Sequence, residues 1–290
     1  MNSTLKAYAI RLFPQVASRP IGLVTNIQTY HMFQRRETYM KLARLPLPER
    51  LAEMRKPDVR AAILAERDIS SGKAGMMANA NTIFRRAAPN LYELDLPIDY
   101  EPTSDKRFGE RAKAAGQTVE EFMYDFLIGN DGRNFAIQLG ANYYNGNFDV
   151  IRDMLLHPDT ITGLSDAGAH VNLIFDGVAP TYQMIHWARD RTRGEGLPLE
   201  FIIAKQTKRN ADLYGMTDRG SLEVGKRADI NVIDFERLSL GELEVRSDLP
   251  AGGTRILQPA SGYLATFVNG VQTRKDDVDT GARPGRLVRS

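Results

Sequence analysis

The order of hydrophobic and polar positions predicts strands and helices in turn along the first hundred residues. Residues 12–27, LFPQVASRPIGLVTNI, hold two short apolar runs separated by Arg19-Pro20, which predicts a strand, a turn and a second extended segment. Helical patterns follow over 34–67, with prolines where helices begin or end. Residues 68–106 lack periodicity and are rich in Asn, Gly, Pro and Ser, so we expect a long excursion with little regular structure.

The middle of the chain alternates more regularly. Thr118 and Glu121 form a capping box ahead of an amphipathic stripe that stops near Gly129, which predicts a helix. FAIQLGANYY then predicts a buried strand, Asn147 caps a further helix, and ITGLSD predicts the next strand. APTYQMIHWARDRTR follows as a helix, and this alternation argues for parallel strands.

The pattern changes near residue 216. LPLEFIIAKQTKRNADLYG predicts one helix whose inner face carries Leu199, Ile203, Thr207, Ala211 and Tyr214. Beyond it, ADINVIDF and YLATFVNGVQT are short β-type runs, and Asn269-Gly270 signals a two-residue hairpin. We therefore expect a first region at 1–215, including the excursion at 68–106, and a small β-rich domain at 216–290.

Composition excludes several classes of function. The 290 residues carry a formal charge of only +2 with both signs interspersed, so nucleic acid is not an expected partner. The absence of cysteine removes disulfides, thiolate metal sites and a cysteine nucleophile. No run reaches membrane-spanning length and the first residues do not form a signal peptide, so we expect a cytoplasmic protein without a membrane partner.

One carboxylate stands where parallel α/β folds place their chemistry. Asp166 ends the run ITGLSD, and the carboxyl ends of parallel strands open onto the active site. There it could accept a proton from water or bind a metal, or it could simply cap the following turn. His170 is close enough to reach the same opening, although a lone histidine is more often structural.

The remaining candidates are weaker. His31, His157 and His186 are more simply structural, and no H-x-H or H-x-x-x-H pair exists to hold zinc. Ser165 adjoins Asp166 but has no identifiable base, so a serine nucleophile is unsupported. RDRTR is interpreted as a solvated helix face. Basic residues of the excursion could pair with a substrate carboxylate, namely Lys73, Arg85 and Arg86.

Several motifs together resemble the amidohydrolase superfamily, in the branch of the N-acyl-D-amino-acid deacylases. The similarity is carried by GLSDAGAH, PTYQMIHWARDR, KQTKRNADLYGMTDRGSLEVGKRADINVIDF and LPAGGTRILQPASGYLATFVNGV, and it extends back through GNFDVIRDMLLHP, DYEPTSD and PQVASRPIGL. It thus covers nearly the whole chain, and the segment from Asp218 to Asp234 is its most specific part.

The resemblance implies a metal-dependent (β/α)8 barrel beside a small composite β-sandwich. It implies zinc as the cofactor, a small N-acyl amino acid or related amide as substrate, and an Asp at the end of the eighth strand that moves the proton. Asp166 matches that position and is also a candidate metal ligand. Asp229 is another family-like carboxylate, which we interpret as structural because it begins a strand of the small domain.

The chain departs from this family pattern in two respects. The H-x-H pair and the middle-strand metal ligands are missing, and only about three barrel strands are recognisable where a closed barrel needs eight. We therefore expect the C-terminal part of a longer or two-chain enzyme, which would associate with its missing half or with itself. The alternative is a catalytically inactive remnant that acts as a structural or partner-binding module.

Overall fold

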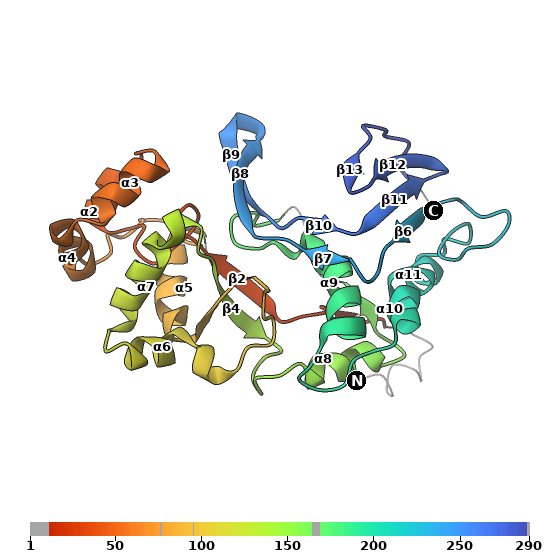
Figure 1. The fold of residues 1–290 in the computed structure, drawn as a ribbon, viewed down its shortest axis with the longest axis horizontal. Coiled ribbons are helices and arrows are strands. Elements are labelled where there is room, and N and C mark those ends of the chain that lie inside the picture. The colour runs from red at the N-terminus through yellow and green to blue at the C-terminus, as the bar shows by residue number, and fades with distance from the viewer. Residues whose placement is uncertain (1–11, 76, 95, 164–168, 289–290) are drawn as a thin grey trace.

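The computed structural model describes residues 12–75, 77–94, 96–163 and 169–288, which mix helices and strands (Figure 1). The helices are α2 (Glu37–Leu42), α3 (Leu47–Met54), α4 (Pro57–Ala65), α5 (Ala80–Ala87), α6 (Phe108–Ala114), α7 (Val119–Ile128), α8 (Asp149–Leu156), α9 (Ala179–Ile185), a π-helical turn (His186–Asp190), α10 (Leu199–Gln206) and α11 (Lys208–Leu213). The strands are β1 (Gln15–Val16), β2 (Ile21–Thr25), β3 (Leu91–Glu93), β4 (Ala136–Ala141), β5 (Ile161–Thr162), β6 (Ile230–Ile233), β7 (Ser239–Leu240), β8 (Glu244–Leu249), β9 (Gly253–Leu257), β10 (Ala260–Ser261), β11 (Tyr263–Val268), β12 (Val271–Lys275) and β13 (Val278–Asp279).

A three-stranded sheet in the order β2-β4-β3 separates two hydrophobic cores. Val24, Ile137 and Tyr92 stand in register across the sheet and belong to one core. Leu91 and Ala136 belong to the other core. Because successive side chains of a strand point to opposite faces, one core lies on each face of the sheet. Figure 1 shows α5, α6 and α7 on one side of β2 and β4, and α8, α9 and α10 on the other.

The predicted parallel arrangement holds for one pair of strands and fails for the central sheet. Gln15 and Val16 of β1 pair in parallel with Ile161 and Thr162 of β5. Strand β4, however, is antiparallel to both β2 and β3. Helices α6 and α7 connect β3 to β4, so a helical connection by itself does not fix the direction in which the next strand enters the sheet.

Two further expectations are corrected by the helices. The excursion at 68–106 contains α5 and β3, because Ala80, Phe84 and Ala87 recur at helical spacing and are buried in the first core. The helix expected over 197–215 is broken at Thr207, whose φ and ψ are −118° and −86°. The inner face also differs from the expected one, because Ile203, Thr207 and Tyr214 are exposed.

Small antiparallel sheets dominate the chain after residue 229. Strands β13, β12, β11 and β6 form a four-stranded sheet, and β8 pairs with β9. The hairpin predicted at Asn269-Gly270 joins β11 to β12, with positive φ at both residues, as expected for a tight hairpin turn. Among the described residues, the sheets have two to four strands and do not close into a barrel. No helix within the described ranges is long and apolar enough to cross a bilayer.

Candidate active site

The predicted catalytic strand is present, but its final residues lie outside the described part of the chain. Strand β5 ends at Thr162 and pairs with β1. Ser165 and Asp166 fall within residues 164–168, which the structure does not describe. The proton-transfer and metal-binding roles of Asp166 therefore stay predictions.

His170 lies in the turn that follows this segment. Its side chain is exposed and its backbone φ is +46°, in the left-handed region that histidine, like asparagine and aspartate, adopts more often than other residues besides glycine. Its carbonyl oxygen accepts hydrogen bonds from the amides of Leu173, at 2.7 Å, and Ile174, at 3.2 Å. The backbone of His170 thus shapes the turn, and a catalytic role for its ring stays a prediction.

The loop 169–178 is fastened on two sides. The Val24 amide of β2 donates to the Leu173 carbonyl at 2.7 Å, and the Ile256 amide of β9 donates to the Val171 carbonyl at 2.8 Å. The Thr254 hydroxyl also donates to Asn172 Oδ1 at 3.1 Å. The chain that follows Asp166 is therefore held between the central sheet and the β8–β9 hairpin.

A buried ion pair anchors the end of this loop. Arg19, at the turn between β1 and β2, donates from Nε to Asp176 Oδ1 at 2.9 Å and makes a second bond from Nη2. Its guanidinium carbon lies 4.4 Å from the centroid of Phe175. Burial alone would lower the pKa of Arg19, but Asp176 and two tyrosines raise it, so the guanidinium stays charged.

A cavity of about 520 Å³ opens beside this ion pair. Its wall begins at Ala169, three residues after Asp166, and includes Phe175 and Asp176 on one side and Ile256 and Gln258 on the other. This volume falls within the roughly 300–1,000 Å³ of small-molecule sites. The loop that follows the predicted catalytic residue thus lines a space large enough for a small substrate.

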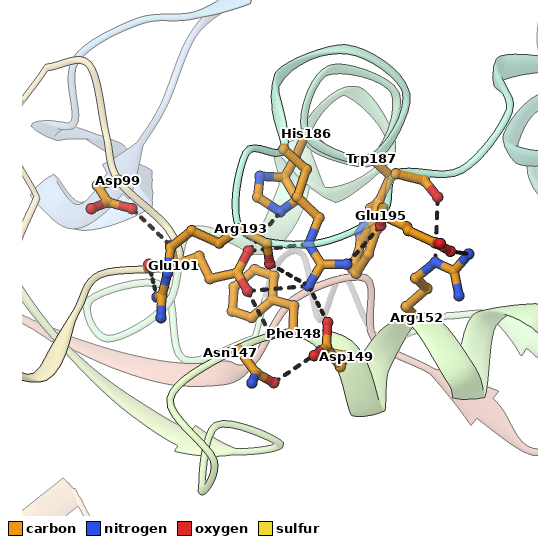
Figure 2. A network of polar contacts seen from close by, with 12 residues as sticks. Asp99, Glu101, Asn147, Phe148, Asp149, Arg152, His186, Trp187, Arg193 and Glu195 are labelled. Atoms are coloured by element: carbon orange, nitrogen blue, oxygen red, sulfur yellow. Dashed lines mark hydrogen bonds and ion pairs between the residues drawn. The ribbon is translucent and has the colours of Figure 1, made fainter.

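A second polar cluster surrounds Glu101, whose importance the sequence did not reveal. Glu101 accepts hydrogen bonds from Arg191 Nε and Nη2, each at 3.2 Å, and from the Phe148 amide at 2.7 Å. Arg191 also donates to Asp149 at 2.6 Å. Figure 2 shows Glu101 directed at the first turn of α8, where it satisfies an amide that the helix leaves free.

This cluster corrects the interpretation of RDRTR as a solvated face at Arg191, whereas Asp190, Thr192 and Arg193 are exposed as expected. The Arg191 side chain is fully buried, and Arg193 donates to the Tyr143 hydroxyl and to the Glu101 carbonyl. Burial alone would lower the pKa of Arg191, but the hydrogen bonds that it donates to Glu101 and Asp149 raise it. Arg191 directly follows the π-helical turn, and its backbone amide donates to the His186 carbonyl at 2.8 Å, which fixes its position beside Glu101.

The three other histidines have structural surroundings, as expected. His31 is fully buried and its Nδ1 accepts a hydrogen bond from the Phe33 amide at 3.2 Å. His157 Nδ1 accepts one from the Asp159 amide at 3.2 Å, at the turn that follows α8. His186 lies among aromatic rings, and burial followed by the nearby Arg191 charge lowers its pKa to about 4.

Of the three basic residues suggested to bind a substrate carboxylate, one is already paired within the protein and two are exposed. Arg85 donates to Asp68 at 3.0 Å and to the Met32 carbonyl at 2.9 Å, and it pairs with Glu120. Lys73 and Arg86 are exposed. The structural interpretation of Asp229 is supported, because its Oδ1 accepts the Asn269 amide at the hairpin turn, at 2.7 Å.

The described residues do not fit the metal that the family resemblance implies. Within residues 12–75, 77–94, 96–163 and 169–288, no three histidine, aspartate or glutamate side chains are grouped so that they could hold an ion. Glu101 and Asp149 both pair with Arg191, so a cation already occupies the position between these two carboxylates. No chemical step is therefore assigned to a metal held by these residues.

Three solved structures are similar to the chain at low identity. They are a D-aminoacylase mutant in complex with CuCl2 (19% identity, TM-score 0.39), a D-aminoacylase described as defining a novel subset of amidohydrolases (18%, 0.36), and an N-acyl-D-glutamate deacylase from Bordetella bronchiseptica with zinc and a phosphonate inhibitor (19%, 0.38). The likeness covers 84%, 81% and 71% of this chain. It covers only 46%, 44% and 39% of theirs, so the chain spans less than half of each protein.

Comparison at the level of sequence families is more decisive. No curated protein matches the chain significantly. The model of the amidohydrolase family, in contrast, matches residues 5–274, which include the predicted catalytic segment and the strands up to β12. Because this match covers most of its length, the chain belongs to the amidohydrolase family.

Proposed function

We propose that the chain contributes to the hydrolysis of a linear amide, with an N-acyl-D-amino acid as the substrate class. The observation that carries this proposal is the family match over residues 5–274, since amidohydrolases cleave carbon–nitrogen bonds. The substrate class follows from the motifs GLSDAGAH and the segment from Asp218 to Asp234. Confinement of the substrate in the cavity beside Ala169 and Asp176 is compatible with this role.

In this proposal Asp166 acts first as a general base and then as a general acid. Its carboxylate accepts a proton from the attacking water and then delivers it to the nitrogen of the departing amine. The proton is thus transferred from the water to the nitrogen of the amine product, and Asp166 returns to its ionised form. The loop 169–178, held by Arg19 and Val24, would fix the chain next to Asp166 in position.

The proposal places catalysis in a longer or two-chain enzyme with a partial (β/α)8 barrel. The described ranges contain no group of side chains that could hold a metal. The metal that amidohydrolases use would therefore be held by residues outside these ranges. We therefore expect the isolated chain to bind zinc weakly. Stoichiometric, tightly bound zinc in the pure protein, measured by elemental analysis, would contradict this assignment.

The decisive experiment supplies the missing segment. The chain is co-expressed with a polypeptide that carries an amidohydrolase H-x-H strand, and release of amino acid from N-acetyl-D- and N-acetyl-L-amino acids is measured with zinc present. We expect hydrolysis that falls by about 100-fold or more in Asp166→Asn. Asp153→Asn, an exposed carboxylate of α8, serves as the control and should retain activity.

The outcomes separate the two candidate roles. Hydrolysis that is equally fast in the Asp166→Asn protein would exclude the proposed proton transfer. If no pairing yields hydrolysis, although the chain folds and binds the added polypeptide, the protein is better described as a structural or partner-binding module.

A further inference from the structure

The cavity beside Ala169 and Asp176 has one cationic side chain in its described lining. This is Arg255 of strand β9, whose side chain is 35% exposed. The acidic residue of the same lining, Asp176, is already paired with the buried Arg19. An anion that enters the cavity therefore meets a guanidinium and no unpaired carboxylate in the described part of the wall.

Strand β9 is bonded to the loop 169–178 on both sides of Arg255. The Thr254 hydroxyl and the Ile256 amide donate hydrogen bonds to this loop, at 3.1 and 2.8 Å. The position of Arg255 relative to the loop is therefore set before a ligand binds. Such preorganisation lowers the cost of ordering a side chain on binding.

An ion pair within the β8–β9 hairpin orients the guanidinium and leaves part of it free. Arg255 Nε and Nη2 donate to the two carboxylate oxygens of Asp248, each at 2.7 Å. A guanidinium has five N–H donors, and no acceptor in the described part of the chain bonds Nη1. The pair with Asp248 thus fixes the plane of the guanidinium, while the end formed by Nη1 and Nη2 stays available to a second carboxylate.

An N-acyl amino acid carries such a carboxylate close to the bond that is cleaved. Only the nitrogen and the α-carbon separate the carboxylate from the amide carbonyl, so the group that binds it must lie in the same cavity as the reacting bond. The cavity wall begins at Ala169, in the chain that follows Asp166, and it includes Arg255. The basic residues suggested within the excursion at 68–106 do not line it.

We propose that Arg255 binds the carboxylate of the substrate through Nη1 and Nη2 and thereby positions the amide. This inference rests on the proposed function, because it takes the N-acyl amino acid as its ligand. The amino-acid side chain then packs on the apolar part of the wall, which includes Ile174, Val178 and Leu249. The cavity should accordingly select an N-acyl amino acid over its uncharged amide.

The test measures binding rather than hydrolysis. The 290-residue chain is titrated by ligand-observed NMR with N-acetyl-D-leucine and with N-acetyl-D-leucinamide, in which an amide replaces the carboxylate. We expect the acid to bind with a dissociation constant on the order of 1 mM. The amide should bind about tenfold more weakly, because it offers no charge to the guanidinium.

Two variants of Arg255 separate its charge from its shape. Arg255→Met removes the charge, so it should weaken binding of the acid about tenfold and leave binding of the amide unchanged. Unchanged binding of the amide also shows that the cavity is intact. Arg255→Lys keeps a charge without the planar fork and should weaken the acid by only about threefold.

A second arginine of the hairpin provides the matched control. Arg246 stands opposite Arg255 in the β8–β9 register, pairs with Glu244 and does not line the cavity. Arg246→Met therefore loses the same charge from the same hairpin and should bind the acid like the wild type.

The inference is overturned if the acid shows no saturable binding, if acid and amide bind equally well, or if Arg255→Met binds the acid undiminished. Equal losses for acid and amide in both Arg255 variants would also overturn it, because they would show an effect on the fold rather than on the carboxylate.

These outcomes are separable from those of the proposed function. Carboxylate-dependent binding without hydrolysis in any pairing would support the role of Arg255 and refute only the hydrolysis. Hydrolysis by the co-expressed enzyme with the same KM for N-acetyl-D-leucine in Arg255→Met would overturn the role of Arg255 and leave the hydrolysis standing.

Discussion

At the scale of single residues, His31 is a buried imidazole in the first core. Burial, with a smaller contribution from Arg50, lowers its pKa to about 3, whereas an ordinary histidine titrates near 6.5. Between these values the unfolded chain binds a proton that the folded chain does not. The free energy of unfolding should therefore fall as the pH drops below 6.5.

The variant His31→Asn tests this expectation. An asparagine oxygen can still accept the Phe33 amide, but it cannot be protonated in this range. We expect the wild type to lose about 1 kcal/mol more than the variant between pH 7 and pH 5.5 in urea unfolding. His157→Asn, at an exposed site, is the control and should follow the wild type. Equal slopes for wild type and His31→Asn would refute the argument.

Lys205 should make the stability of the protein depend on pH in the alkaline range. Its side chain is fully buried, donates to the Thr160 carbonyl and hydroxyl at 2.9 and 2.8 Å, and has its pKa lowered from 10.5 to about 8 by burial. Between pH 8 and 10.5 the unfolded chain holds the proton that the folded chain has released. Stability should thus rise with pH across this interval.

Substitution of Lys205 by methionine should remove this pH-dependent gain. Relative to Lys205→Met, the wild type should gain roughly 1–2 kcal/mol between pH 8 and pH 9.5, followed by denaturant unfolding. Lys208→Met removes a half-exposed lysine from the neighbouring helix and should keep the wild-type slope. A wild-type slope in Lys205→Met as well would show that this ammonium is solvated.

At the scale of elements, the Glu101–Arg191 pair joins the first turn of α8 to the end of the π-helical turn. Removal of Arg191 would leave the Glu101 carboxylate buried without its counter-charge. We expect Arg191→Met to lower the free energy of unfolding by about 3–5 kcal/mol. The control Arg152→Met loses a pair with Glu195, which is 80% exposed, and should cost less than about 1 kcal/mol. Similar losses in the two variants would argue against a desolvated pair.

Local chemistry made several elements predictable from the sequence. The Thr118–Glu121 capping box forms both of its bonds, and the Asn269-Gly270 turn joins β11 to β12, because each depends only on neighbouring residues. Strand direction was harder to predict. The antiparallel direction of β4 depends on its pairing with β2 and β3, which are distant in sequence, and the burial of Arg191 follows a π-helical turn that leaves no signal in the hydrophobic pattern.

At the scale of the whole molecule, the family was predictable and the site only in part. The match over 5–274 agrees with the motif resemblance, since both depend on residues that can be compared position by position. Arg19 was recognised only as half of a turn signal, because its partner Asp176 is 157 positions away. Such distant pairs, like that of Glu101 with Arg191, cannot be derived from local patterns.

Exposed apolar side chains predict association of the isolated chain. Leu222 is 81% exposed and Val224 is fully exposed, in the loop between α11 and β6. Burial of apolar surface lowers the free energy by about 25 cal/mol per Å². We therefore expect concentration-dependent self-association of the protein in sedimentation velocity experiments. The double variant Leu222→Ser, Val224→Ser should shift the protein toward monomer more than Tyr144→Ser does. An unchanged distribution would exclude this loop as the contact.

The sheet β2-β4-β3 also determines how the protein comes apart. A different core packs on each face of the sheet, so unfolding of either core exposes one face of the sheet to water. We therefore expect that neither half persists as an intermediate and that heating produces a single calorimetric transition. A chain with two separate cores would in this way behave as one cooperative unit.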